Sequence, residues 1–304
     1  MYNFVRSNAL TGTALMPANI CECVPATYRK AGMDIAFCDI TFGTWEPDEQ
    51  QITEILASRP KIRVLHYNRT YGDTSDRTSF FRALRERFPR LVIIDDACLS
   101  IPPTEPQETL ADLVLYSTGR AKPVSLGFGA FADLRKGWAY KLYSLDGSDV
   151  AEKDAAFDQS IKCCHAKHLP AEWDVLLDDW MDPSGVPPTD YLEQVKQEHK
   201  HILHHQAVIQ DIYAKLPNAL PASMQGWRYN ILVRNLQACL DALFAAGLFA
   251  SHHYMSLGNG YFDDTKTPNS DWLEQHVINL FEGNEYTPEM AEQTVQVLQD
   301  IGRF

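Results

Sequence analysis

In the first half of the chain, short apolar runs alternate with segments that have apolar residues at helical spacing. This pattern predicts strands that alternate with helices. Short apolar runs predict strands at 13–17, 34–40, 62–67, 91–95 and 112–117. Apolar residues at helical spacing predict helices over 47–58 and 76–88. This alternation is typical of an α/β fold, in which helices cover both faces of a mostly parallel sheet.

The second half has a different pattern, which predicts a smaller α+β unit. A helix is expected from about 191 to 215, and strand-like and helical segments follow it as far as a final helix opened by Thr287 and Pro288. The proline-rich stretch 181–190 is the best candidate for a hinge. We therefore expect a large domain over 1–180, a hinge and connecting helix over 181–215, and a small domain over 216–304.

Composition narrows the classes of partner. The chain has 304 residues and a formal net charge of -13, which argues against nucleic acid or an anionic membrane surface as a partner. No apolar run is long enough for a membrane span, and the start of the chain lacks the pattern of a secretory signal, so we expect a cytoplasmic protein. The seven cysteines show no disulfide-like spacing and are expected to be reduced thiols.

One lysine, Lys122, stands between two apolar segments in the stretch "ADLVLYSTGRAKPVSLGFGAFADL", residues 111–134. Both segments are predicted as core strands, so the lysine lies in a loop between them. Most lysines are solvated surface cations. A lysine in a partly dry pocket can instead lose its proton near neutral pH and attack an aldehyde. Asp95, Asp96 and Ser117 fall at the carboxyl ends of predicted parallel strands, where such sheets bind ligands.

Histidine and cysteine pairs give a weaker signal. His201 and His205 are four residues apart on a predicted helix, and a second group comprises Cys163, Cys164, His165 and His168. Neither group has a second pair at the spacing of a zinc site. We therefore expect a polar helix face and a thiol-bearing turn, and no metal.

Four segments, in this order, resemble the DegT/DnrJ/StrS family of pyridoxal-phosphate-dependent sugar aminotransferases. They are "ALMPANICECVPATYRKAGMDIAFCDI", "VLHYNRTYGD", "LVIIDDACLSIP" and "YSTGRAKPVSLGFGAF". The resemblance implies the fold type I aminotransferase architecture, a pyridoxal 5′-phosphate (PLP) cofactor and a homodimer. It also implies amino transfer, with glutamate as the donor, to a keto sugar nucleotide.

The resemblance assigns roles residue by residue. Lys122 would bond to the cofactor aldehyde and move protons as the catalytic acid and base. Asp96 would pair with the pyridinium nitrogen and keep it protonated. Asp95 competes for this role, but strand alternation points Asp95 and Asp96 to opposite faces, and the family pattern selects Asp96. Ser117 would reach the phosphate or the phenolic oxygen of the cofactor. Gly127 and Gly129 would let the chain pass close to the site.

The substrate residues are less well defined. Arg69, Arg120 and Arg228 are candidates for an anionic nucleotide, and His253 and Tyr254 lie in a segment that relatives place near the substrate. Two alternatives stay open. The chain could catalyse another PLP-dependent reaction on a sugar, or it could be a degenerate member that binds a nucleotide or a protein without chemistry.

The segment before the first predicted strand is unusually short for this family. About a dozen residues precede that strand, whereas relatives have a helix and a turn there that bind the cofactor phosphate. We therefore expect PLP to bind weakly.

Overall fold

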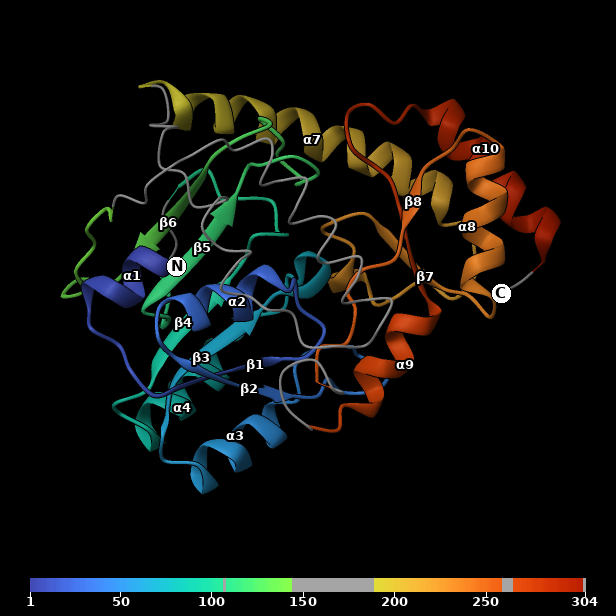
Figure 1. Cartoon of the computed structure of the whole chain (residues 1–304). Coiled ribbons are helices and arrows are strands. Elements are labelled where there is room, and N and C mark those ends of the chain that lie inside the picture. Colours follow the sequence, from blue (N-terminus) through green and yellow to red (C-terminus); the bar gives the residue numbers. More distant parts are fainter. Residues whose placement is uncertain (106–107, 144–188, 259–264, 303–304) are drawn as a thin grey trace.

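A computed structural model describes residues 1–105, 108–143, 189–258 and 265–302. Its larger sheet has six strands in the order β2-β1-β3-β4-β5-β6 (Figure 1). The first five are mutually parallel, and β6 runs antiparallel to β5. Their bounds are β1 Thr13–Pro17, β2 Asp34–Cys38, β3 Ile62–Asn68, β4 Val92–Asp96, β5 Leu113–Ser117 and β6 Ala130–Leu134. The expected α/β fold with a mostly parallel sheet is confirmed.

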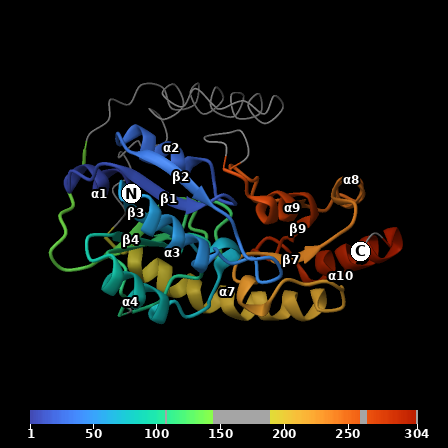
Figure 2. The same cartoon turned by 90° about the horizontal axis from the view of Figure 1, so that it is seen from below.

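Helices cover both faces of this sheet, as Figure 2 shows. On one face lie α1 (Tyr2–Ser7) and α2 (Cys23–Lys30), which bury Phe4 and Tyr28 against it. On the other face lie α3 (Glu49–Ser58) and α4 (Thr78–Arg87), which bury Ile52 and Phe81. Each face thus has its own apolar core, because neighbouring residues of a strand point to opposite sides.

A second, three-stranded antiparallel sheet has the order β7-β9-β8. Its strands are β7 Tyr229–Leu232, β8 Ala250–Ser251 and β9 Val277–Leu280, and α8 (Leu236–Ala245), α9 (Pro268–His276) and α10 (Pro288–Ile301) accompany them. The start of α10 is as predicted, because the Thr287 hydroxyl accepts a hydrogen bond from the Met290 N–H over 3.3 Å.

The long helix α7 (Tyr191–Tyr213) connects the two sheets. Its first turns pack Tyr191 and Val195 against Val124, beside the larger sheet. Its last turns pack Ile209 and Tyr213 into the core of the smaller sheet. The predicted helix is therefore present, and the short helices η1 (Thr70–Gly72) and η2 (Ala222–Met224) form a further contact between the two halves.

Three local predictions were wrong. The dozen residues before β1 were expected to lack the helix that relatives have there, but Tyr2–Ser7 form α1, whose two buried side chains give too short a pattern to reveal a helix. The segment around β6 was predicted as a buried strand, but β6 is an edge strand whose residues alternate between exposed and half-buried. The pattern of residues 137–145 is strand-like, but its described residues, 137–143, form no strand.

Some predictions fall on residues that the structure does not describe. Residues 181–188 of the predicted hinge and the cysteine and histidine group at 163–168 lie outside the described ranges. The division into domains at 180 and 215 stays a prediction. Within the described ranges, no helix is long and apolar enough to cross a bilayer.

Candidate active site

A cavity of about 600 Å³ opens at the carboxyl ends of β3, β4 and β5. Parallel pairing sets these three strand ends side by side, with Asn68 opposite Asp96 in the register of β3 and β4. Side chains from these ends line the cavity together with the first residues of the chain and the segment 140–143. Of the predicted site residues, five line it: Asp96, Ser117, Lys122, Gly129 and Tyr254.

Asp96 is a buried, ionised carboxylate in the cavity wall. Its Oδ2 accepts a hydrogen bond from His66 Nε2 over 3.0 Å, and its Oδ1 accepts one from the Cys98 backbone N–H over 3.0 Å. Burial raises the pKa of Asp96, but the hydrogen bond and charge of His66, with the hydrogen bonds from Cys98, oppose it and bring that pKa down to about 2. The side chain therefore carries its negative charge throughout the neutral range.

His66 links Asp96 to a tyrosine deeper in the core. The imidazole is fully buried, and its second nitrogen, Nδ1, lies 3.0 Å from the Tyr28 hydroxyl. Burial raises the pKa of Tyr28 well above its usual value, with the nearby charge of Asp96 adding to the effect. Tyr28 thus keeps its proton. The hydrogen-bonded series of Tyr28, His66 and Asp96 fixes the orientation of the Asp96 carboxylate.

The loop that carries Lys122 is held at both ends. At its start, the Thr118 hydroxyl lies 2.6 Å from the hydroxyl of Tyr191 on α7. At its end, Gly129 has a φ of +88°, and a Cβ there would lie 2.8 Å from the Tyr191 ring. Only glycine adopts this positive φ without strain and also leaves room for the Tyr191 ring. Lys122 itself is half-buried and lines the same cavity as Asp96.

Tyr254 brings the segment after β8 to the cavity. It is half-buried, and burial raises the pKa of its hydroxyl well above the usual value. The neighbouring His253 does not line the cavity; its Nδ1 lies 3.0 Å from the Ser251 hydroxyl. Burial, with the nearby positive charge of Arg228, lowers the pKa of His253 to about 4, so its imidazole is neutral at pH 7.

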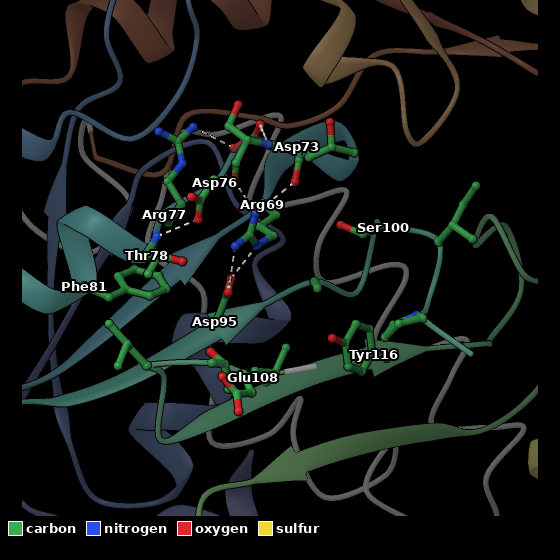
Figure 3. A pocket seen from close by; sticks show the side chains of 18 residues that line it. Arg69, Asp73, Asp76, Arg77, Thr78, Phe81, Asp95, Ser100, Glu108 and Tyr116 are labelled. Atoms are coloured by element: carbon green, nitrogen blue, oxygen red, sulfur yellow. Dashed lines mark hydrogen bonds and ion pairs between the residues drawn. The ribbon is translucent and has the colours of Figure 1, made fainter. Parts of the chain in front are cut away.

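Arg69 lies on the opposite face of the sheet, in a second cavity of about 390 Å³ (Figure 3). Its guanidinium binds both carboxylate oxygens of Asp95, over 2.7 and 2.9 Å, and its third nitrogen donates to the carbonyls of Asp73 and Ser75. Strand alternation separates Asp95 from Asp96, as the sequence predicted. Arg69 therefore has all its nitrogens engaged away from the first cavity.

The remaining predicted residues also lie outside the first cavity. The Arg228 guanidinium is buried between the rings of Trp227 and Phe281, 4.0 and 3.8 Å from their centroids. Arg120 is exposed in the lysine loop. Gly127 does not line the cavity, and its φ of +79° suits glycine.

The first cavity fits PLP, the cofactor that the sequence resemblance implies. An ionised carboxylate that is held by hydrogen bonds matches a protonated ring nitrogen. A half-buried lysine amine on the same cavity matches an aldehyde, and the Ser117 hydroxyl matches an anionic or phenolic oxygen. The described residues hold no cluster of three or more metal-ligating side chains, and their five cysteines form no disulfide with one another.

Comparison with solved structures confirms the resemblance at the level of the fold. A putative PLP-dependent aminotransferase from Bacillus cereus has a TM-score of 0.68 and 16% identity, covering 97% of this chain and 81% of its own. A DegT/DnrJ/EryC1/StrS aminotransferase from Brucella abortus has a TM-score of 0.64 and 13% identity, covering 98% and 82%. DesI, solved in the presence of its TDP-sugar product, has a TM-score of 0.66 and 15% identity, covering 97% and 76%.

No family model and no curated protein matches the chain. The solved structures therefore carry the comparison, and they show that this chain has the fold type I aminotransferase architecture.

Sequence reasoning missed three side chains that organise the site. His66 stands in one of the segments that carry the resemblance, and on β3 it shares a face with Asn68, the register partner of Asp96; this parity could have revealed it. Tyr28 and Trp227 gave no such signal, because their contacts join segments far apart in the sequence.

Proposed function

We propose that this protein is a PLP-dependent aminotransferase that transfers an amino group, with glutamate as the donor, to a keto sugar nucleotide. One observation carries the proposal: Lys122 and an ionised Asp96 line the same cavity at the carboxyl ends of parallel strands. A lysine amine and a carboxylate in one cavity are the two groups that this cofactor needs from a protein.

When bound, PLP supplies an aldehyde and an electron sink. Asp96, ionised and held by His66, would keep a proton on the ring nitrogen. Lys122 would hold the cofactor at its aldehyde, and its amine would be the base that moves a proton at the reacting carbon. Tyr254 helps to cover the cavity and exclude water, which protects reactive groups from hydrolysis.

The substrate class rests on the structural neighbours. DesI was solved in the presence of its TDP-sugar product. We propose that this chain also acts on a nucleotide-linked sugar. Of the three arginines considered for its phosphates, Arg120 is the best placed, because it is exposed in the lysine loop. Arg69 and Arg228 are already engaged, with Asp95 and with two aromatic rings.

Covalent trapping tests the proposal. PLP is titrated into the purified protein, borohydride is added, and the modified peptide is located by mass spectrometry. We expect a visible absorption band and a label on Lys122. Lys122→Ala removes both, whereas Lys136→Ala, at an exposed lysine outside the cavity, leaves both unchanged. A label on another lysine, or none at high PLP concentration, overturns the assignment.

One finer point belongs to the same proposal. A homodimer would cover Tyr140 and Leu142, which line the cavity and are 53% and 70% exposed. Light scattering should therefore show a dimer, and a fully active monomer would contradict it.

A further inference from the structure

Trp227 connects the smaller sheet directly to the lysine loop. Its side chain is 4% exposed, and its indole Nε1 donates a hydrogen bond of 2.6 Å to the carbonyl oxygen of Ala121. Ala121 is the residue immediately before Lys122. A bond to this carbonyl fixes the peptide plane from which Lys122 begins, and with it the direction in which the lysine side chain leaves the backbone.

The conformation of Ala121 needs such a bond. Its φ is +59°, in the left-handed region that disfavours every residue with a Cβ. Its side chain is exposed, so packing does not hold it. Among the described residues, the Lys122 N–H makes one hydrogen bond, a long one of 3.4 Å to the Gly119 carbonyl. The indole is therefore the strongest contact that keeps this peptide in place.

Trp227 is itself fixed. Its backbone N–H donates to the Tyr71 carbonyl over 2.9 Å, and the rings of Tyr71 and Trp227 are parallel with centroids 6.5 Å apart. Next to them, the backbones of Gly72 and Gly226 touch: a Cβ on Gly226 would lie 2.5 Å from the Gly72 carbonyl oxygen. The donor is thus built into a rigid contact between the two halves of the chain.

We propose that Trp227 is a positioning residue for Lys122, holding the lysine amine toward the cavity through the Ala121 carbonyl. The inference rests on the proposed function, since it assigns Lys122 the bond to the cofactor. It adds a residue that does not line the cavity. It also predicts that the contact between the two halves of the chain controls the lysine.

Trp227→Phe tests this, because it removes the N–H and keeps an aromatic ring. We expect about a tenfold fall in kcat at nearly unchanged KM for the sugar substrate. The fraction of PLP that borohydride fixes on Lys122 should fall at subsaturating PLP. Without cofactor, reductive methylation should change its rate at Lys122 and at no other lysine. A variant with 3-benzothienylalanine at position 227 keeps the bicyclic volume without the donor and covers the case of a poorly folded Trp227→Phe.

Two further variants separate positioning from stability. Trp138→Phe loses an indole bond of 2.8 Å to Asp112, outside the cavity, and should leave the labelling of Lys122 unchanged. Ala121→Gly added to Trp227→Phe should restore much of kcat, because glycine accepts a positive φ without strain. If wild type is labelled at Lys122 but neither variant at position 227 changes kcat or labelling, the inference is wrong. If wild type is not labelled, the proposed function fails first.

Discussion

Asp95 and Asp96 are adjacent in β4, and the structure gives them opposite tasks. Asp95 points to the face covered by α3 and α4, where Arg69 binds both of its oxygens. Asp96 points to the face covered by α1 and α2, where it lines the larger cavity. Burial raises the pKa of Asp95, which stays raised despite Arg69, with the charges of Asp96 and Asp73 adding to the effect. Burial also acts on Asp96, but the hydrogen bond and charge of His66, together with hydrogen bonds from Cys98, lower the pKa of Asp96.

The comparison teaches that the partner, and not the residue type, decides what a buried carboxylate does. A bidentate arginine uses both oxygens of Asp95 and leaves none directed at a ligand. Each carboxylate oxygen of Asp96 accepts one hydrogen bond, from the His66 nitrogen or from a backbone N–H. Both oxygens keep a lone pair that can accept from a cation in the cavity. One carboxylate is therefore structural, and the other can act on a bound ring.

The largest effect is expected from Asp96→Asn. An amide carries no charge to hold the ring nitrogen protonated, so amino transfer should fall by about a thousandfold, the upper range for loss of a positioned electrostatic group. The borohydride label on Lys122 should persist, since the aldehyde chemistry does not need Asp96. Single-turnover kinetics measure the rate of amino transfer, and peptide mapping locates the label on Lys122. A normal rate would remove Asp96 from its assigned role.

Asp95→Asn should change stability instead. It leaves the largely buried Arg69 without its full partner, which should lower the free energy of unfolding by about 3 kcal/mol. The rate per folded molecule should stay that of wild type. Glu108→Gln, at an exposed carboxylate of the same second cavity, is the matched control and should change stability by less than about 0.5 kcal/mol. Urea unfolding measures the stability of both variants. A loss of rate in Asp95→Asn without a loss of stability would show that Asp95, and not Asp96, acts on the cofactor.

The pKa of Asp96 predicts a specific acid dependence. Because the folded value, about 2, lies below the value of about 3.9 expected in the unfolded chain, the contribution is present above about pH 4 and is lost as pH falls through 2. The stability gap between wild type and Asp96→Asn should narrow by about 2 kcal/mol from about pH 5 to 2. Urea titrations at several pH values measure this gap. A constant gap would show that the fold does not lower the pKa of Asp96.

The smallest effect is expected from Tyr28→Phe. The loss of one buried hydroxyl partner of His66 should cost about 1 kcal/mol, and amino transfer should fall about fivefold as Asp96 becomes less well held. Tyr213→Phe, which loses a hydrogen bond of 2.8 Å to the Phe281 carbonyl, is the control. The nitrogen-15 NMR signals of the His66 ring should shift in Tyr28→Phe and stay unchanged in Tyr213→Phe. Unchanged signals in both variants would contradict a hydrogen-bonded series from Tyr28 through His66 to Asp96.

The sequence predicted those features that depend on local pattern. Five parallel strands, the lysine loop and the separation of Asp95 from Asp96 follow from period and strand alternation. The positions of Arg69 and Arg228 could not be predicted in this way, because each guanidinium is bound by residues distant in the sequence or by a ring stack. Helix α1 was missed because two buried residues show no period. The link from Trp227 to Ala121 joins positions 106 apart, beyond any local signal.

The contact between Gly72 and Gly226 also limits how this sequence can vary. A Cβ at either position would meet backbone atoms of the other at under 3 Å, and Gly72 has a φ of +76°. Backbone atoms cannot move aside as a flexible side chain can, so alanine at one position cannot be accommodated by a smaller residue at the other. The two sites therefore tolerate no compensating exchange. A library randomised at both should return the glycine pair, whereas neighbouring exposed positions such as Thr74 and Ala222 should accept many residues.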